Sequence, residues 1–387
     1  ANQIAAGEVI QRPASAVKEL LENAIDSEAS QIDLVIKDAG KTLIQVTDNG
    51  CGMSATDARM AFERHATSKI QSVNDLFTIR TMGFRGEALA SIAAIAQVEV
   101  KSRMTEEELG TCISIEGSEV KTQEFCQCPA GSTIMVKNLF FNVPARRKFL
   151  KSNNVELRHI LEEFQRVALA HPDLTISLLN NGKPVFQLRP ASLKERIVAI
   201  FGQQFKKRLI PVDQEMETLT ISGFVGKPEF AKKVRGEQYF FVNKRFMKHA
   251  YLNHAVDNAF DQLLPEKSYP AYFIFIDIDP NEIDINIHPT KTEIKFQDER
   301  VMYSVLRSAV KAALGKFSVT PSLDFEKDPS LDFMMPSKDT PIRQPKLKLD
   351  PGYNPFETGS GQSSARMRQN RENWEKLYPE QEIQSTE

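Results

Sequence analysis

The sequence predicts an α+β protein with a larger first part and a smaller α/β unit that follows it. Residues 15–26 carry apolar side chains at the spacing of an amphipathic helix. Residues 282–287 alternate strictly between polar and apolar side chains, as a half-buried strand does. Hydrophobic periodicity stops near residue 318, and eight of the 20 prolines follow it. Residues 318–387 are therefore expected to form a disordered linker.

The helix expected at residues 15–26 has one apolar face and one acidic face. The apolar stripe comprises Val17, Leu20, Leu21, Ala24 and Ile25. The opposite row comprises Glu19, Glu22, Asn23 and Asp26. Most polar helix faces are simply solvated, but a solvated row would normally include Lys or Arg as i,i+4 partners of its carboxylates. Only Lys18 is near, so the row suits a bound cation or a water that is to be deprotonated.

Three glycine-containing segments supply further polar groups. The apolar strand 43–46 runs into Asp48-Asn49-Gly50-Cys51-Gly52, which leaves a carboxylate at the strand end. The glycines let the backbone approach a planar ligand or adopt a positive φ. The basic loop that starts at Gly83 leads into a helix of small residues, and the N–H groups at such a helix start favour phosphate. Gly131-Ser132-Thr133 forms a polar turn before the apolar strand 134–136.

Together these segments hold the groups needed to bind and hydrolyse a nucleotide with Mg²⁺. Gly40-Lys41-Thr42 is similar to the end of a P-loop, but that motif needs glycine at position 35, where this chain has Val35. The sequence therefore excludes an ATPase of the P-loop kind.

The motifs resemble those of the GHKL ATPases, the superfamily of gyrase, heat-shock chaperones and histidine kinases. The four motifs are Glu19-x-x-x-Asn23, Asp48-x-Gly50-x-Gly52, Gly83-Phe84-Arg85-Gly86-Glu87-Ala88 and Gly131-Ser132-Thr133. Segments 1–9, 64–69, 83–92, 141–150 and 288–291 narrow the resemblance to the MutL mismatch-repair family, over residues 1 to about 317. The resemblance implies a GHKL-type ATPase domain, with helices on one face of a mixed sheet, and then a smaller α/β domain of the ribosomal-protein domain-2-like fold.

The resemblance also assigns roles to single residues. Glu19 is the implied general base and Asn23 the implied Mg²⁺ ligand, one helical turn apart on one face. Asp48 is the implied acceptor for the adenine amino group, and Lys291 is the implied γ-phosphate ligand contributed by the second domain. The other implied ATP-binding residues are Gly50, Gly52, Met53, Thr67, Gly83, Phe84, Arg85, Gly86, Glu87, Ala88 and Thr133.

The expected organisation is an ATP-binding domain at 1–195, a second domain at 196–317 and the linker at 318–387. The second domain is expected to contain strands at 219–221, 239–242, 272–278 and 283–287, and helices at 251–264 and 298–314. The four cysteines are expected to be free thiols, because Cys126-x-Cys128 lacks zinc spacing. Neither a run of about 18 apolar residues nor a signal peptide is present, so the sequence indicates neither membrane insertion nor secretion.

Basic residues gather in the middle of the chain although the net charge is −2. Residues 137–248 contain 21 Lys and Arg against 10 Asp and Glu, without an aromatic ladder for base stacking. This distribution favours sequence-independent contact with DNA phosphates over a mixed, merely solvated surface. The candidate DNA-binding residues are Arg146, Arg147, Lys232, Lys233, Lys244, Arg245 and Lys248. On this view Arg245→Glu should weaken DNA binding and spare basal ATPase activity.

The resemblance implies a mismatch-repair mediator in which ATP binding closes a dimeric clamp on double- or single-stranded DNA and slow hydrolysis resets it. The implied partners are a MutS-type mismatch sensor, a downstream nuclease or helicase, and a second copy of the chain. Family members dimerise through a C-terminal domain that follows the linker, and ATP brings their N-terminal parts together. A cytoplasmic, nucleoid-associated protein is expected. The alternatives are an ATP-switched scaffold whose hydrolysis only releases partners, and a topoisomerase subunit.

Overall fold

Helices and strands occupy most of the chain as far as residue 319. The computed structural model describes residues 9–63, 82, 86–260, 263–284 and 294–319. The helices are α2 (Pro13–Asp26), α3 (Ala55–Met60), α4 (Ala88–Ile95), α5 (Pro144–Phe149), α6 (Asn153–Ala170), α7 (Leu193–Phe201), α8 (Ala250–Ala259) and α9 (Glu299–Val319). Within these described residues, no helix is both long enough and apolar enough to cross a membrane.

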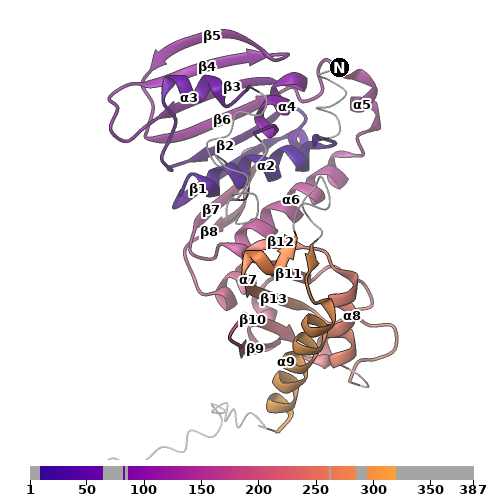
Figure 1. The fold of residues 1–387 in the computed structure, drawn as a ribbon. Helices are drawn as coiled ribbons and strands as arrows, with labels where there is room; N and C mark the ends of the chain where they lie inside the picture. The colour runs from indigo at the N-terminus through magenta and orange to yellow at the C-terminus, as the bar shows by residue number, and fades with distance from the viewer. Residues whose placement is uncertain (1–8, 64–81, 83–85, 261–262, 285–293, 320–387) are drawn as a thin grey trace, which may run out of the picture. The chain divides into compact units, whose positions relative to one another are not determined.

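An eight-stranded sheet forms the first layer (Figure 1). Its spatial order is β5 (Glu119–Cys126), β4 (Gly110–Glu116), β3 (Gln97–Arg103), β6 (Gly131–Lys137), β2 (Leu43–Asp48), β1 (Gln31–Lys37), β7 (Thr175–Asn180) and β8 (Lys183–Leu188). The strands β1 and β7 pair in parallel, whereas β1 and β2 pair antiparallel, so the sheet is mixed.

The helices cover the apolar face of this sheet. In β2, Ile44 and Val46 are buried and alternate with the half-buried Gln45 and Thr47, because successive side chains point to opposite faces. Figure 1 shows α2, α4 and α6 on one side of the sheet, and α2 packs directly on β2 and on α6. The expected α+β fold, with helices on one face of a mixed sheet, is confirmed.

A five-stranded sheet follows in the chain. Its order is β12 (Arg245–Met247), β11 (Gln238–Val242), β13 (Tyr272–Ile278), β10 (Leu219–Gly226) and β9 (Leu209–Glu215). Helices α8 and α9 pack together, and α9 also packs on β9. Along β11, Phe240 and Val242 belong to one hydrophobic cluster and Tyr239 and Phe241 to another. The strand is thus buried on both faces, which explains its continuous apolar sequence. The short strands β14 (Ile283–Asp284) and β15 (Lys295–Phe296) form a separate pair.

Most elements lie where the sequence predicts them, but several bounds differ. The strand expected at 219–221 continues to Gly226. Of the strand expected at 283–287, only Ile283 and Asp284 lie within the described residues. The helix expected at 251–264 begins at Ala250 and ends at Ala259, because Phe260 already leaves helical geometry. The helix expected at 298–314 starts at Glu299 and continues to Val319. The boundary expected at residue 195 falls within α7 and stays a prediction. The four cysteines are free thiols, as expected.

Candidate functional site

Helix α2 is the element that carries the acidic row. It starts with Pro13, whose missing N–H costs nothing in the first turn, and it buries Val17, Leu20 and Leu21 against the core. Glu19 lies on the other side, with 20% of its side chain exposed, and Asn23 is half-buried. The amphipathic pattern therefore places both residues on a partly open face, as the sequence predicts.

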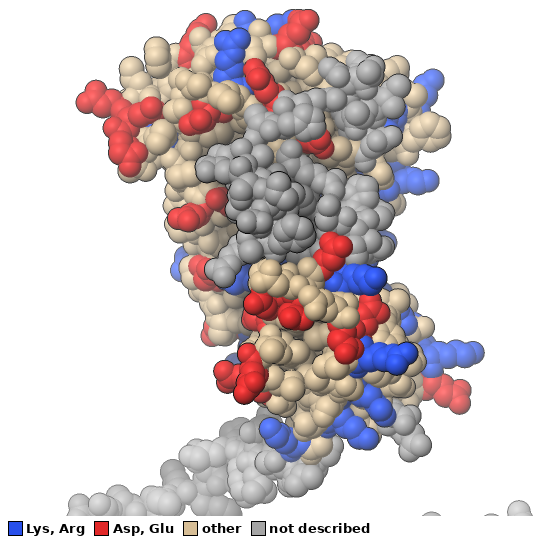
Figure 2. Space-filling view, viewed as in Figure 1, with Lys and Arg blue, Asp and Glu red and all other residues tan. Residues whose placement is uncertain are grey.

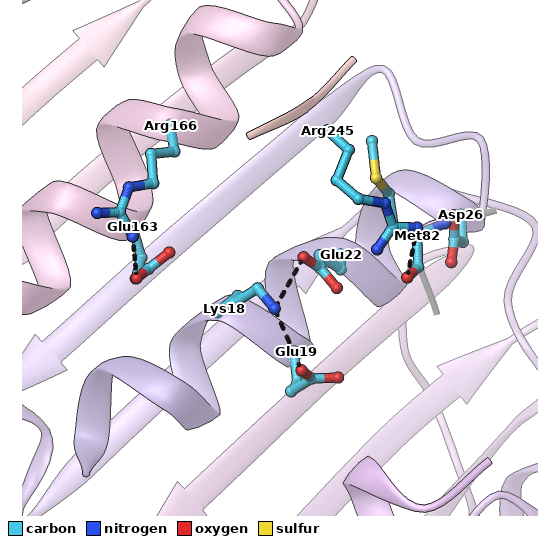
Figure 3. A network of polar contacts seen from close by, with 8 residues as sticks. All are labelled: Lys18, Glu19, Glu22, Asp26, Met82, Glu163, Arg166 and Arg245. Atoms are coloured by element: carbon cyan, nitrogen blue, oxygen red, sulfur yellow. Dashed lines mark hydrogen bonds and ion pairs between the residues drawn. The ribbon is translucent and has the colours of Figure 1, made fainter. Parts of the chain in front are cut away.

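Lys18 lies beside the acidic row and forms ion pairs with two of its carboxylates (Figure 3). Its Nζ lies 3.4 Å from Glu22 Oε1 and 3.7 Å from Glu19 Oε1. Burial alone would lower the pKa of Lys18, but Glu22, Glu19 and Glu163 outweigh it and raise the pKa above its ordinary value. Lys18 is therefore a fixed positive charge beside Glu19, and Glu22 has a partner within its own helix.

Asp48 ends strand β2 and is buried, with 9% of its surface exposed. Its Oδ1 accepts hydrogen bonds from Gly50 N at 3.0 Å, Ser132 N at 3.3 Å and Ser27 Oγ at 3.4 Å. Among the described residues no donor is bonded to Oδ2. Burial raises the pKa of Asp48 above its ordinary value, and the three hydrogen bonds oppose that rise. One oxygen is therefore saturated by the protein, and the other can accept a hydrogen bond from a ligand.

The glycines around Asp48 allow main chains to approach closely. A Cβ on Gly50 would lie 2.5 Å from Ser27 O, and the adjacent Cys51 N donates to that same oxygen at 3.0 Å. Gly52 has a φ of +71°, and a Cβ there would lie 2.1 Å from Arg103 O. These glycines were expected to let the backbone approach a planar ligand or adopt a positive φ, and Gly52 has the positive φ. Both glycines also make room for neighbouring backbone, which fixes the turn after Asp48, and their contact with a ligand stays a prediction.

Replacement of Gly52 by alanine should destabilise the fold by about 2 kcal/mol more than replacement of Gly182. Gly182 has a similar φ of +77°, but nothing lies within 4 Å of its Cβ position. Both substitutions place alanine in left-handed backbone, at about 1–2 kcal/mol each, whereas only Gly52→Ala meets a carbonyl. Urea unfolding of the two variants measures the difference. Equal losses would show that the turn relaxes around the added methyl group.

Ser132 faces Asp48, and sequence reasoning chose its neighbour Thr133 instead. The register pairs Asp48 with Ser132 and Thr47 with Thr133, so Thr133 points to the other face of the sheet. Thr133 Oγ1 donates to Thr47 Oγ1 at 3.3 Å, whereas the hydroxyl of Ser132 lies 2.9 Å from that of Ser102. The apolar alternation of Ile134 and Val136 could have identified Ser132, since it lies two residues before Ile134.

Some of the remaining predicted ATP-binding residues lie within the residues that the structure describes, and others lie outside them. Met53 N donates to Ser102 Oγ at 2.8 Å, which ties the turn after Asp48 to β3. Gly86 has a φ of +62°, and Glu87 forms the N-cap of α4, which begins at Ala88. The predicted site residues that lie outside the described residues are Thr67, Gly83, Phe84, Arg85 and Lys291.

The seven predicted DNA-binding residues have different environments. Five of them are exposed: Arg147, Lys232, Lys233, Lys244 and Lys248. Lys232 pairs with Glu237, and Arg146 Nη1 donates to Ile10 O at 3.1 Å. Figure 2 shows Lys and Arg side chains projecting from the part of the molecule that holds α8 and α9, with Asp and Glu side chains grouped beside them.

Arg245 is the exception, because it is buried. Only 7% of its surface is exposed, and its Nη2 donates to Met82 O at 3.1 Å (Figure 3). The expectation that Arg245 lies on the surface with Lys244 and Lys248 is therefore wrong. Its neighbours in sequence alternate around the start of β12, which turns Lys244 and Lys248 outward and Arg245 inward. Arg245→Glu would place a carboxylate against a buried carbonyl and is not a clean test of DNA contact.

Comparison with known proteins shows which class of domain the first sheet and its helices form. Residues 11–137 match the family described as histidine kinase-, DNA gyrase B- and HSP90-like ATPase. The helix with Glu19 and Asn23, the strand-end Asp48 and its glycine turn all fall within that match. The first sheet with its helices is thus an ATPase domain of the GHKL class. Residues 197–315 match the family described as DNA mismatch repair protein, C-terminal domain.

The relatives identify the family. The chain is 60% identical over 357 residues to the DNA mismatch repair protein MutL of Christiangramia forsetii, which covers 92% of this chain and 58% of that protein. It is 55% identical over 381 residues to MutL of Flavobacterium psychrophilum, which covers 98% of this chain and 62% of that protein. The chain belongs to the MutL family of DNA mismatch repair proteins, and it spans about three fifths of the length of these relatives.

Solved structures share the fold. The structure described as the N-terminal domain of a DNA repair protein superposes with a TM-score of 0.72 at 24% identity, over 82% of this chain and 99% of that one. The ATPase domain of the mismatch repair endonuclease MutL of Aquifex aeolicus superposes with a TM-score of 0.56 at 25% identity, over 78% of this chain and 99% of that one.

Proposed function

We propose that this chain binds and slowly hydrolyses ATP as the nucleotide-dependent part of a mismatch-repair mediator. The observation that carries the proposal is the carboxylate of Asp48. Its Oδ1 is saturated by three protein donors, and its Oδ2 accepts none from the described residues. A buried acceptor at a strand end suits a ligand that brings its own N–H donor. The amino group of adenine is such a donor, whereas guanine presents an acceptor at the corresponding position.

The roles proposed for α2 follow from its partly open face. Glu19 would act as the general base that takes a proton from the attacking water, with the ammonium of Lys18 holding its carboxylate from 3.7 Å. Asn23, one turn further on, would contribute a single carbonyl oxygen to Mg²⁺, a metal that proteins usually bind through few side chains together with substrate phosphates. When bound, the metal neutralises charge on the phosphates. Lys291 is proposed to contact the γ-phosphate.

The proposed biological role is that of a switch between mismatch recognition and excision. ATP binding would bring two copies of the chain together on DNA, and hydrolysis would release them. A MutS-type mismatch sensor and a downstream nuclease or helicase are the proposed partners. Membership of the MutL family supports this role, and the exposed Lys244 and Lys248 supply the positive charge for sequence-independent contact with phosphates.

Size-exclusion chromatography with and without a nonhydrolysable ATP analogue tests the proposal. A dimer that forms only with the analogue is the expected result, together with calorimetric binding of ATP but not of GTP. Absence of ATP binding would refute the proposed function. Binding without dimer formation would refute only the association step.

The variant Lys244→Glu/Lys248→Glu should weaken DNA binding about equally for all sequences and leave the basal ATPase rate unchanged. Both side chains are exposed, so their replacement removes positive charge from the surface. The slope of log affinity against log salt should fall by about 0.9 for each phosphate that the variant no longer neutralises. Fluorescence anisotropy at several salt concentrations measures this slope.

Lys37→Glu is the control for charge. Lys37 is exposed at the end of β1 and lies outside the basic segment. The control reverses one positive charge and the double variant reverses two. A loss of binding free energy in the control that is half that of the double variant would show that overall charge, and not the pair Lys244 and Lys248, governs DNA binding.

A further inference from the structure

The main chain of Met82 is held on both sides by charged side chains. Met82 N donates to Asp26 Oδ1 at 2.8 Å, and Met82 O accepts from Arg245 Nη2 at 3.1 Å (Figure 3). Asp26 is the last residue of α2, the helix of Glu19 and Asn23. Arg245 is the first residue of β12, in the second sheet. One peptide segment thus connects the helix of the ATP site with the second sheet.

The contact between Met82 and Arg245 is buried, and the contact between Met82 and Asp26 is partly buried. Met82 is 8% exposed and Arg245 is 7% exposed, and they line a cavity of about 40 Å³ together with Lys18, Glu22 and His171. Hydrogen bonds between a charged group and the backbone are stronger than neutral ones. Breaking one leaves a buried polar group without its hydrogen bond. The two bonds therefore fix the position of Met82 more firmly than ordinary turn contacts would.

Arg245 is itself held rigidly by the second sheet. The turn between β11 and β12 consists of Asn243 and Lys244, whose φ values of 48° and 65° are those of a tight type I′ hairpin turn. The carboxamide of Asn243 donates to Ile278 O at 2.9 Å and accepts from Ile278 N at 3.0 Å. The hairpin is thereby bonded to β13. Any displacement of the second sheet consequently moves Arg245 and alters its hydrogen bond to Met82.

We propose that Asp26 and Arg245 are positioning residues for the nucleotide site, which set its affinity for ATP by fixing Met82. Met82 immediately precedes Gly83, the first residue of the glycine-rich sequence that leads to α4. The second sheet thus influences the ATP site through Arg245, which acts on Met82 and does not itself contact the nucleotide. The inference rests on the proposed function, because it concerns the affinity of that same site.

The test compares Arg245→Gln, Arg245→Lys and Asp26→Asn in steady-state ATP hydrolysis and in calorimetric titration with ADP. Arg245→Gln should raise the KM for ATP and the Kd for ADP about tenfold and leave kcat nearly unchanged, because it removes a charge-assisted hydrogen bond that acts only on binding. Arg245→Lys keeps one donor and should recover part of the affinity. Arg307→Gln, at an exposed position of α9, is the matched control.

The double variant Arg245→Gln/Asp26→Asn distinguishes positioning from simple destabilisation. If both residues act through Met82, the two effects on KM should combine to less than their product. Independent, multiplicative effects would overturn the proposal. So would an unchanged KM in Arg245→Gln, even if its melting temperature falls. Hydrogen exchange at the Met82 amide should accelerate in each folded variant. Failure of the unmodified protein to bind ATP or ADP would instead refute the proposed function.

Discussion

Replacement of Glu19 by alanine is expected to reduce the kcat for ATP hydrolysis at least about a hundredfold while ATP binding is retained. Glu19 lies on the open face of α2 with 20% of its side chain exposed, so its removal leaves the buried stripe of the helix intact. Lys18 keeps Glu22 as a partner at 3.4 Å. Phosphate release under single-turnover conditions measures the chemical step, and calorimetry measures binding.

Glu106→Ala is the control, because Glu106 is an exposed carboxylate in a turn. A Glu19 variant that no longer binds ATP would show that Glu19 is a binding residue and not the general base. The same variant distinguishes an ATP-switched scaffold from a clamp that hydrolysis resets. If the protein acts as an ATP-switched scaffold, the trapped ATP-bound dimer still recruits its partners. If hydrolysis is needed to reset a clamp, the trapped dimer loses repair function.

Replacement of Asp48 by asparagine is expected to weaken ATP binding at least about a hundredfold with little loss of fold stability. The carboxamide keeps an acceptor oxygen for Gly50 N and Ser132 N, which lie 3.0 Å and 3.3 Å away. The amide nitrogen, however, replaces the oxygen that would accept from adenine. It is a donor that faces the donor of the adenine amino group, so no hydrogen bond forms between them. Calorimetric titration with ATP measures the loss. Asp213→Asn, on the exposed side of β9, is the control. Retained affinity would remove Asp48 from the adenine site.

The pH dependence of stability gives an independent check on Asp48. Burial raises its pKa above the ordinary 3.8, against the effect of its hydrogen bonds. The folded protein therefore holds this proton more tightly than the unfolded chain. The resulting stabilisation is complete below pH 3.8 and is lost as the pH rises through the raised pKa. Asparagine does not titrate, so Asp48→Asn should gain stability relative to the native protein as the pH rises towards neutrality. Urea unfolding at a series of pH values measures this difference.

Local periodicity allowed much of the fold to be predicted. The 3.6-residue spacing of Val17, Leu20 and Leu21 identified α2, because a helix must bury a continuous stripe. The strand end at Asp48 was also predictable, since an apolar run there meets two glycines. The same reasoning missed Ser132, although the alternation of β6 contained the signal. Charge runs were a weaker guide, because they do not reveal which side chain of a run is buried.

The sequence alone determined which chemical groups are available and on which face of each element they lie. Glu19 and Asn23 share a helix face, and Asp48 ends a strand, because these relations depend only on residues within one or two turns. Only the tertiary structure decided that Arg245 is an internal residue bonded to Met82, 163 positions away. Whether a guanidinium faces solvent or a buried carbonyl depends on desolvation balanced by contacts between distant segments. No pattern of neighbouring residues encodes that balance.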